Sequence, residues 1–85
     1  MHEERMLQDI RRKVEEVARD NGATHVRRVA LWVGALAHLT EDQARARWSE
    51  MTRGTVAQDS ALDIEQSKNL DDPRAQSIVL TSIEI

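Results

Sequence analysis

The first twenty residues alternate between apolar and polar positions with the period of a helix. The apolar positions lie three or four residues apart: Leu7, Ile10, Val14 and Val17. Charged and amide side chains fill the positions between them, so the spacing predicts an amphipathic helix over about 4–20. Asn21-Gly22 follows, and because this pair tolerates the left-handed backbone conformation, it predicts the end of the helix.

The period changes to two over about residues 25–34. Val29, Leu31 and Val33 alternate with less apolar or bulkier neighbours, which indicates a half-buried strand that ends at Gly34. A second helix is predicted to begin after Thr40.

This second helix has signals at both of its ends. Thr40 and Gln43 have the spacing of a capping box. Trp48 and Met51 continue its apolar stripe, and Gly54 supplies the stop.

Two further strands are predicted near the end of the chain, at 61–66 and 78–85. The polar segment 67–76 between them contains Asp71-Asp72-Pro73, which is typical of a turn. Consecutive strands joined by a turn pair most simply as a hairpin. If the last strand has no bulge, one of its faces carries Val79, Thr81, Ile83 and Ile85.

The predicted order is therefore helix, strand, helix, strand, strand. It indicates an α/β (α+β) fold in which two helices cover one face of a three-stranded sheet. The 85 residues suit one small domain, 1–85, which buries about 60% of its unfolded-chain surface.

The charge of the chain excludes several classes of partner. Twelve Lys and Arg against fifteen Asp and Glu leave a net charge of −3, so no overall field attracts nucleic acid or acidic membrane. The chain has no apolar run of bilayer length and no hydrophobic segment behind its polar start. We therefore expect a cytoplasmic protein, and the absence of cysteine fits that compartment.

The chain begins Met1-His2-Glu3, a sequence with chelating chemistry. The amine of Met1, the amide nitrogen of His2 and its imidazole can occupy three sites of a square plane, the geometry that Ni(II) and Cu(II) prefer. The bulk of His2 disfavours removal of the initiator methionine. Glu3 could complete the plane through its amide nitrogen or carboxylate, or could orient the imidazole. The alternative interpretation is a frayed, solvated terminus.

Other candidate residues also have two interpretations. His38 follows the first strand and could reach the terminus as a further metal ligand, or could be a solvated loop residue. His25 fits an exposed strand edge better than a metal site. The group Arg45, Arg47 and Trp48 is either a docking surface or a core tryptophan flanked by solvated arginines, and the helical stripe favours the second.

Several short motifs, in this order and spacing, resemble HypA/HybF-type hydrogenase nickel-incorporation proteins. They are Met1-His2-Glu3, Asn21-Gly22-Ala23, Val33-Gly34-Ala35-Leu36, Thr52-Arg53-Gly54-Thr55-Val56-Ala57, Leu62-Asp63-Ile64-Glu65 and Ser82-Ile83-Glu84-Ile85. The resemblance implies a metallochaperone that passes Ni(II) to a nickel–iron hydrogenase, or in some organisms to urease, usually beside a GTPase. It also implies that His2 and Glu3 belong to the nickel-binding end.

The chain departs from that family in one respect. HypA proteins usually insert a zinc domain with two Cys-x-x-Cys pairs between the last two strands, where this chain has only 67–76 and no cysteine. Nothing in this segment replaces four thiolates, so no structural zinc is expected. Asp71 and Asp72 could hold a hard cation, but solvated turn carboxylates explain them more simply.

The sequence thus predicts a nickel-binding accessory protein rather than an enzyme. It has no cysteine nucleophile, Gly-x-Ser-x-Gly turn, Gly-rich phosphate loop or His-Glu-x-x-His helix. The predicted nickel ligands are Met1, His2, Glu3 and His38, and the expected partners are a hydrogenase large subunit or a maturation GTPase. The alternative is a metal-independent docking module that contacts the same partners through a patch of Arg45, Arg47 and Trp32.

Overall fold

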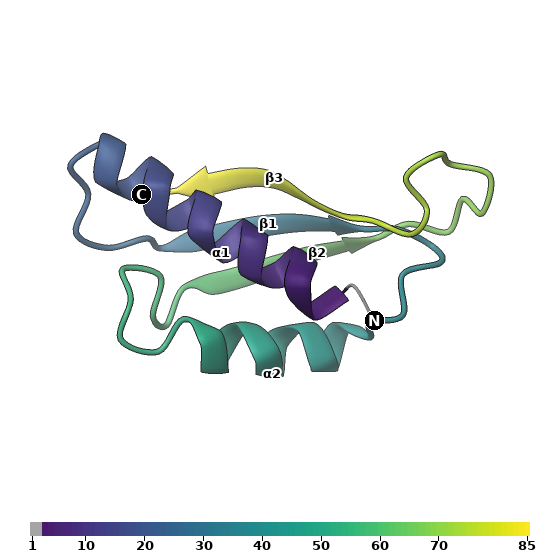
Figure 1. Ribbon diagram of the computed structural model, residues 1–85, viewed down its shortest axis with the longest axis horizontal. Coiled ribbons are helices and arrows are strands. Elements are labelled where there is room, and N and C mark those ends of the chain that lie inside the picture. The colour runs from purple at the N-terminus through teal and green to yellow at the C-terminus, as the bar shows by residue number, and fades with distance from the viewer. Residues whose placement is uncertain (1–2) are drawn as a thin grey trace.

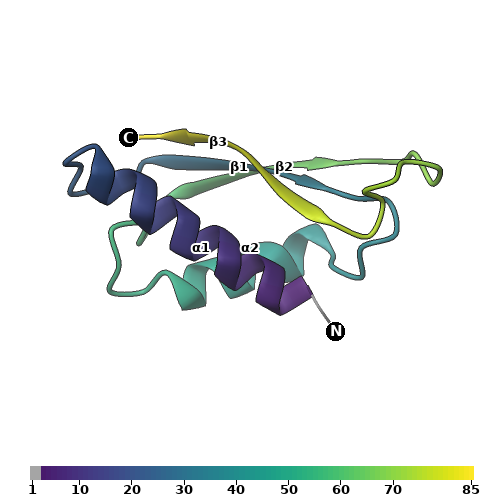
Figure 2. The same ribbon diagram turned by 45° about the horizontal axis from the view of Figure 1, so that its top comes forward.

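The computed structural model describes residues 3–85, which form two helices packed on a three-stranded sheet. The elements are α1 (Glu3–Asp20), β1 (Arg28–Val33), α2 (Glu41–Met51), β2 (Ala61–Gln66) and β3 (Ile78–Glu84). Both helices lie on the same side of the sheet (Figures 1 and 2). The predicted two-layer α+β architecture is therefore confirmed. Within 3–85, neither helix has the length and apolar character needed to cross a membrane.

The strands are ordered β2-β1-β3, so the predicted hairpin between the last two strands is wrong. β1 pairs in parallel with β2 and antiparallel with β3. β1 contributes three fully buried side chains, Val29, Leu31 and Val33, and the central position gives them neighbours on both sides. β1, α2 and β2 form a crossover unit, in which a helix covers the sheet between two parallel strands.

β3 contains a bulge, and the bulge changes which of its side chains face the helices. Ala30 pairs with Ser82 whereas Leu31 pairs with Leu80, so Thr81 is the extra residue. Consequently Ile78, Leu80 and Ile83 pack on the core, while the Thr81 hydroxyl is exposed and donates to the Ala30 carbonyl at 3.1 Å. The predicted shared face of Val79, Thr81, Ile83 and Ile85 required an unbulged strand and is wrong.

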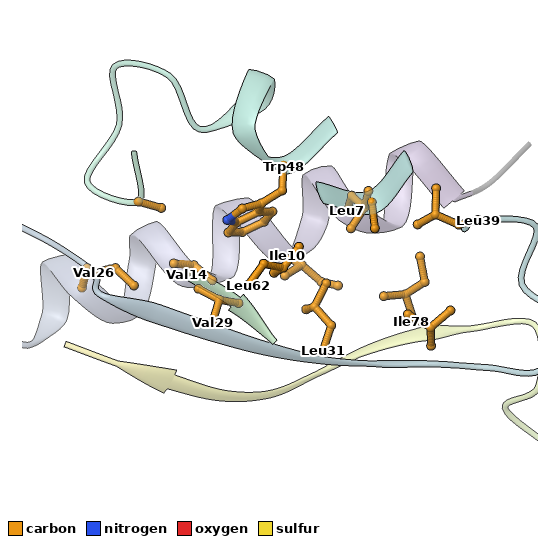
Figure 3. Packing of buried hydrophobic residues seen from close by; sticks show 14 residues of the cluster. Leu7, Ile10, Val14, Val26, Val29, Leu31, Leu39, Trp48, Leu62 and Ile78 are labelled. Carbon is orange, nitrogen blue, oxygen red and sulfur yellow. The ribbon is translucent and has the colours of Figure 1, made fainter. Parts of the chain in front are cut away.

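The core lies between the helices and the sheet (Figure 3). Its labelled side chains come from every element: Leu7, Ile10, Val14, Val26, Val29, Leu31, Leu39, Trp48, Leu62 and Ile78. Trp48 is only 2% exposed, and its indole Nε1 donates to Ser60 Oγ at 2.9 Å. The interpretation of Trp48 as a core residue, rather than part of a docking surface, is confirmed.

The helix ends follow the sequence signals. After α1, Ala23 N donates to Ala18 O and Gly22 N donates to Arg19 O, which is the Schellman arrangement, with Gly22 at a φ of 65°. At the start of α2, Thr40 and Gln43 form the predicted capping box. α2 ends at Met51, three residues before Gly54.

The connection between β2 and β3, residues 67–77, crosses the end of β1. Gly34 N donates to Ser77 O at 2.8 Å, and Leu36 N donates to Ala75 O at 2.7 Å. A Cβ atom on Gly34 would lie 2.2 Å from the Ala75 carbonyl oxygen, closer than any ordinary contact. This crossing places β3 on the far side of β1 from β2.

Candidate metal centre at the start of the first helix

Two of the four predicted nickel ligands, Glu3 and His38, are neighbours in the structure, and their contact uses the backbone of His38 and not its imidazole. Glu3 is the first residue of α1, and its carboxylate Oε2 accepts a hydrogen bond from the backbone N–H of His38 at 3.1 Å. The loop before α2 therefore approaches the start of α1 through the backbone of His38, and His38 is exposed, which agrees with its interpretation as a solvated loop residue. Its role as a nickel ligand stays a prediction. The other two predicted ligands, Met1 and His2, lie outside the described residues.

The third histidine lies elsewhere. His25 is exposed in the connection between α1 and β1, at the opposite end of α1 from Glu3. The observed strand begins at Arg28, later than predicted, so His25 is a connection residue and not a strand-edge residue. Its position fits the interpretation that His25 is not a metal ligand.

The hydrogen bond from the His38 N–H stabilises the ionised form of the Glu3 carboxyl. Donation by the His38 N–H is the largest cause that lowers the pKa of the Glu3 carboxyl below its usual range. The backbone N–H of Glu3 itself is the second cause that lowers this pKa. A glutamate carboxyl is ionised at neutral pH in any case, so the lowered pKa extends the ionised form into more acidic solution.

A surface hollow of about 340 Å³ adjoins this contact. It is lined by Glu3, Glu4, His38, Leu39, Gln43 and Arg47. Arg47 Nη1 donates to Glu4 Oε1 at 2.6 Å, which joins α2 to the first turn of α1. Sequence reasoning missed this pair, because its members are 43 positions apart and neither stands in a recognisable motif.

Residues 3–85 contain no group of three His, Asp or Glu side chains able to hold a metal ion. Glu3 and His38 alone supply too few donors for a stable site, since divalent metals take four or more ligands. The nitrogen donors of the first two residues would be needed to complete a planar set. The donor chemistry at this end therefore suits Ni(II) only when the terminal amine and His2 contribute.

Comparison with known proteins assigns the chain to a family. Residues 1–70 match the family model described as "Hydrogenase/urease nickel incorporation, metallochaperone, hypA". The chain belongs to the HypA family. Hydrogenase maturation factor HypA from Azoarcus sp. (strain BH72) is 43% identical over 65 residues, which cover 76% of this chain and 57% of the relative. HypA from Rhizobium leguminosarum bv. viciae is 38% identical over 66 residues, with 78% and 58% covered.

The fold is also that of HypA. The solution structure of the Ni metallochaperone HypA from Helicobacter pylori superposes with a TM-score of 0.78 at 19% identity, covering 100% of this chain and 97% of that chain. The chain spans 57–58% of the length of the two curated HypA relatives described above. The matched region ends at Leu70, so β3 lies beyond it.

The residues suggested as a docking patch do not share one surface of the HypA-like fold. Arg47 lies between the helices, whereas Trp32 lies on the opposite face of β1 from Leu31 and Val33, with the Arg74 guanidinium 4.8 Å from its ring centroid. Arg45 pairs with Glu41 of α2 and also donates to a carbonyl of β2. A single patch of these three residues is therefore a wrong prediction.

The two aspartates of the 67–77 connection act in local turns. Asp72 Oδ1 accepts from the Arg74 N–H at 2.7 Å, and the Asp71 N–H donates to Asn69 Oδ1 at 3.0 Å. These contacts are the ones that polar side chains make in turns. They agree with the interpretation of Asp71 and Asp72 as turn residues.

Proposed function

We propose that this HypA-family chain is a nickel-binding accessory protein that carries Ni(II) for the maturation of a nickel–iron hydrogenase. The contact of the Glu3 carboxylate with the His38 amide supports this function most directly. This contact holds the start of α1 against the loop that contains His38. Among residues 3–85, His38 is the histidine that lies at this end of the fold. A terminal chelate formed there would have His38 as a neighbour.

In the proposed site, the nickel ligands are the amine of Met1, the amide nitrogen and imidazole of His2, and the amide nitrogen of Glu3. His38 is a candidate for a further position. Amide nitrogens bind nickel in their deprotonated, negatively charged form, and the start of a helix carries a partial positive charge that stabilises such anions. The position of Glu3 at the first turn of α1 therefore favours amide coordination.

The same donors provide a route for release. An α-amine titrates near about 7.7 and an imidazole near about 6.5 in model peptides, and both must be deprotonated to bind metal. Nickel affinity should consequently decrease as the pH falls from 8 to 6. A carrier has to surrender its ion, and ligands near a chain terminus suit that task better than a buried cage.

The domain organisation belongs to the same proposal. Residues 1–85 act as a single nickel-binding domain, and 67–76 stands where HypA proteins insert their zinc domain. Folding then depends on the hydrophobic core, and no structural zinc is needed. The proposed partners are a hydrogenase large subunit or a maturation GTPase in the cytoplasm, and nucleic acid and membrane are not among them.

Calorimetric titration of the untagged protein with Ni(II) tests the proposal. We expect one site, which His2→Ala abolishes while the circular-dichroism spectrum is unchanged. His25→Ala is the matched control, because His25 lies at the other end of α1, and it should bind as the unmodified protein does. Residues added before Met1 should also abolish binding, since an acylated amine no longer coordinates. Equal affinity in the His2→Ala variant would remove the terminal site.

A further inference from the structure

The pair of Glu4 and Arg47 differs from the other ion pairs of the first helix. Arg11 with Glu15, Arg12 with Asp9, and Lys13 with Glu16 each lie within α1. The Glu4–Arg47 pair, at 2.6 Å, is the ion pair that joins α1 to α2 among the described residues. The first turn of α1 is thus held at two points, by Glu3 to the loop before α2 and by Glu4 to α2 itself.

We propose that Arg47 is a positioning residue for the amino-terminal nickel site, an inference that rests on the proposed function. Arg47 binds Glu4 and thereby fixes the first turn of α1. The backbone of this turn includes the Glu3 amide nitrogen, and it is directly bonded to the residues that carry the other donors, 1 and 2. Chelation fixes the backbone that carries the donors in one conformation, and this costs conformational entropy. A turn that is already fixed loses less freedom on binding, so the affinity is higher.

The charge of Arg47 makes this role distinguishable from simple electrostatics. Its guanidinium lines the same hollow as Glu3 and His38. The two deprotonated amides of the proposed chelate cancel the charge of Ni(II), so an effect of the Arg47 charge alone predicts little change in nickel affinity when Arg47 is neutralised. If Arg47 acts by holding Glu4, its neutralisation weakens nickel binding. The two roles therefore predict different outcomes for one substitution.

The first experiment measures Ni(II) affinity by calorimetry in the untagged full chain. We expect Arg47→Gln to bind about two- to fivefold more weakly, the range that an exposed ion pair supplies. The double variant Glu4→Arg/Arg47→Glu exchanges the two charges and should restore affinity to near that of the unmodified protein. Arg12→Gln is the matched control, because it removes an exposed arginine whose partner lies within α1, and it should leave affinity unchanged.

The second experiment needs no nickel. Hydrogen exchange of the His38 amide reports its bond to the Glu3 carboxylate. Arg47→Gln should accelerate exchange at His38, while the amide of Leu31 in the central strand keeps its rate. Arg12→Gln should alter neither. A general loss of stability would instead accelerate both amides, so the comparison separates positioning from destabilisation.

The outcomes separate this inference from the proposed function. If the unmodified protein binds no Ni(II), the proposed function fails and the positioning role fails with it. If the unmodified protein binds but Arg47→Gln binds as tightly or more tightly, only the positioning role is overturned. An unchanged His38 exchange rate in Arg47→Gln, or a charge-exchanged variant that stays weak, also overturns it.

Discussion

Glu3 joins the start of α1 to the loop before α2 through one carboxylate oxygen. Its hydrogen bond from the His38 N–H is stronger when the carboxyl is ionised, and this bond lowers the pKa of Glu3. A folded pKa below the unfolded value means that the contact contributes stability above the unfolded pKa. That contribution is lost as the pH falls through the lowered pKa.

The pH dependence of this contact should therefore differ from that of nickel binding. Between pH 8 and 6 we expect the side-chain carboxyl carbon of Glu3 in the nickel-free protein to keep its chemical shift while nickel affinity falls, because the terminal amine and the His2 imidazole take up protons there. The Glu3 carboxyl shift should change only below the ordinary carboxyl range. A Glu3 carboxyl carbon that titrates together with nickel release would contradict the assignment.

The 67–77 connection packs on the end of β1. Gly34 is the contact point, since any Cβ there would meet the backbone of Ala75. A backbone cannot move aside as the end of a side chain can. The connection that carries the chain from β2 to β3 is thus held at the same end of the fold as the starts of both helices (Figure 1).

Substitution of Gly34 should displace this connection. We expect Gly34→Ala to lower the free energy of unfolding by about 3 kcal/mol, the upper part of the range for overpacking. Gly22→Ala is the control, because Gly22 has open space around it and only its φ of 65° is strained, at about 1 kcal/mol. Urea titration followed by circular dichroism measures both. Equal losses in the two variants would mean that the close approach at Gly34 is absent.

At the scale of the whole molecule, delivery of nickel requires that binding of metal and binding of a partner depend on each other. A partner that distinguishes the loaded from the empty protein must, by linkage, alter nickel affinity in return. A metal-independent docking module has no such dependence. The two functions therefore differ in a measurable property of the complex and not only of the isolated chain.

We expect affinity for a maturation GTPase or hydrogenase large subunit to change when Ni(II) is added, and His2→Ala to remove that change. Binding measured for each partner, with and without Ni(II), tests this expectation. His25→Ala should behave as the unmodified protein does. Partner binding that is indifferent both to nickel and to His2 would favour the docking module over the delivery function.

The sequence alone determined which elements form and where some of them begin or end, because these features depend largely on contacts within a few residues. The strand predicted at 61–66 coincides with β2, and the capping box at Thr40 and the stop at Gly22 occur where predicted. Side-chain periodicity also identified Trp48 as a core residue. At the site, the sequence offered two interpretations of His38, a further ligand near the terminus or a solvated loop residue, and only the structure showed the contact of its backbone with Glu3.

The tertiary structure decided what depends on pairing between distant segments. Strand order was one such feature, since a local turn signal favours a hairpin while burial of β1 favours the central position. The bulge at Thr81 was another, because one extra residue reverses which side chains face the core. The partnership of Glu4 with Arg47 was a third. Ion pairs between separate helices leave no periodic signal in a sequence, because only the packing of the two helices sets their distance.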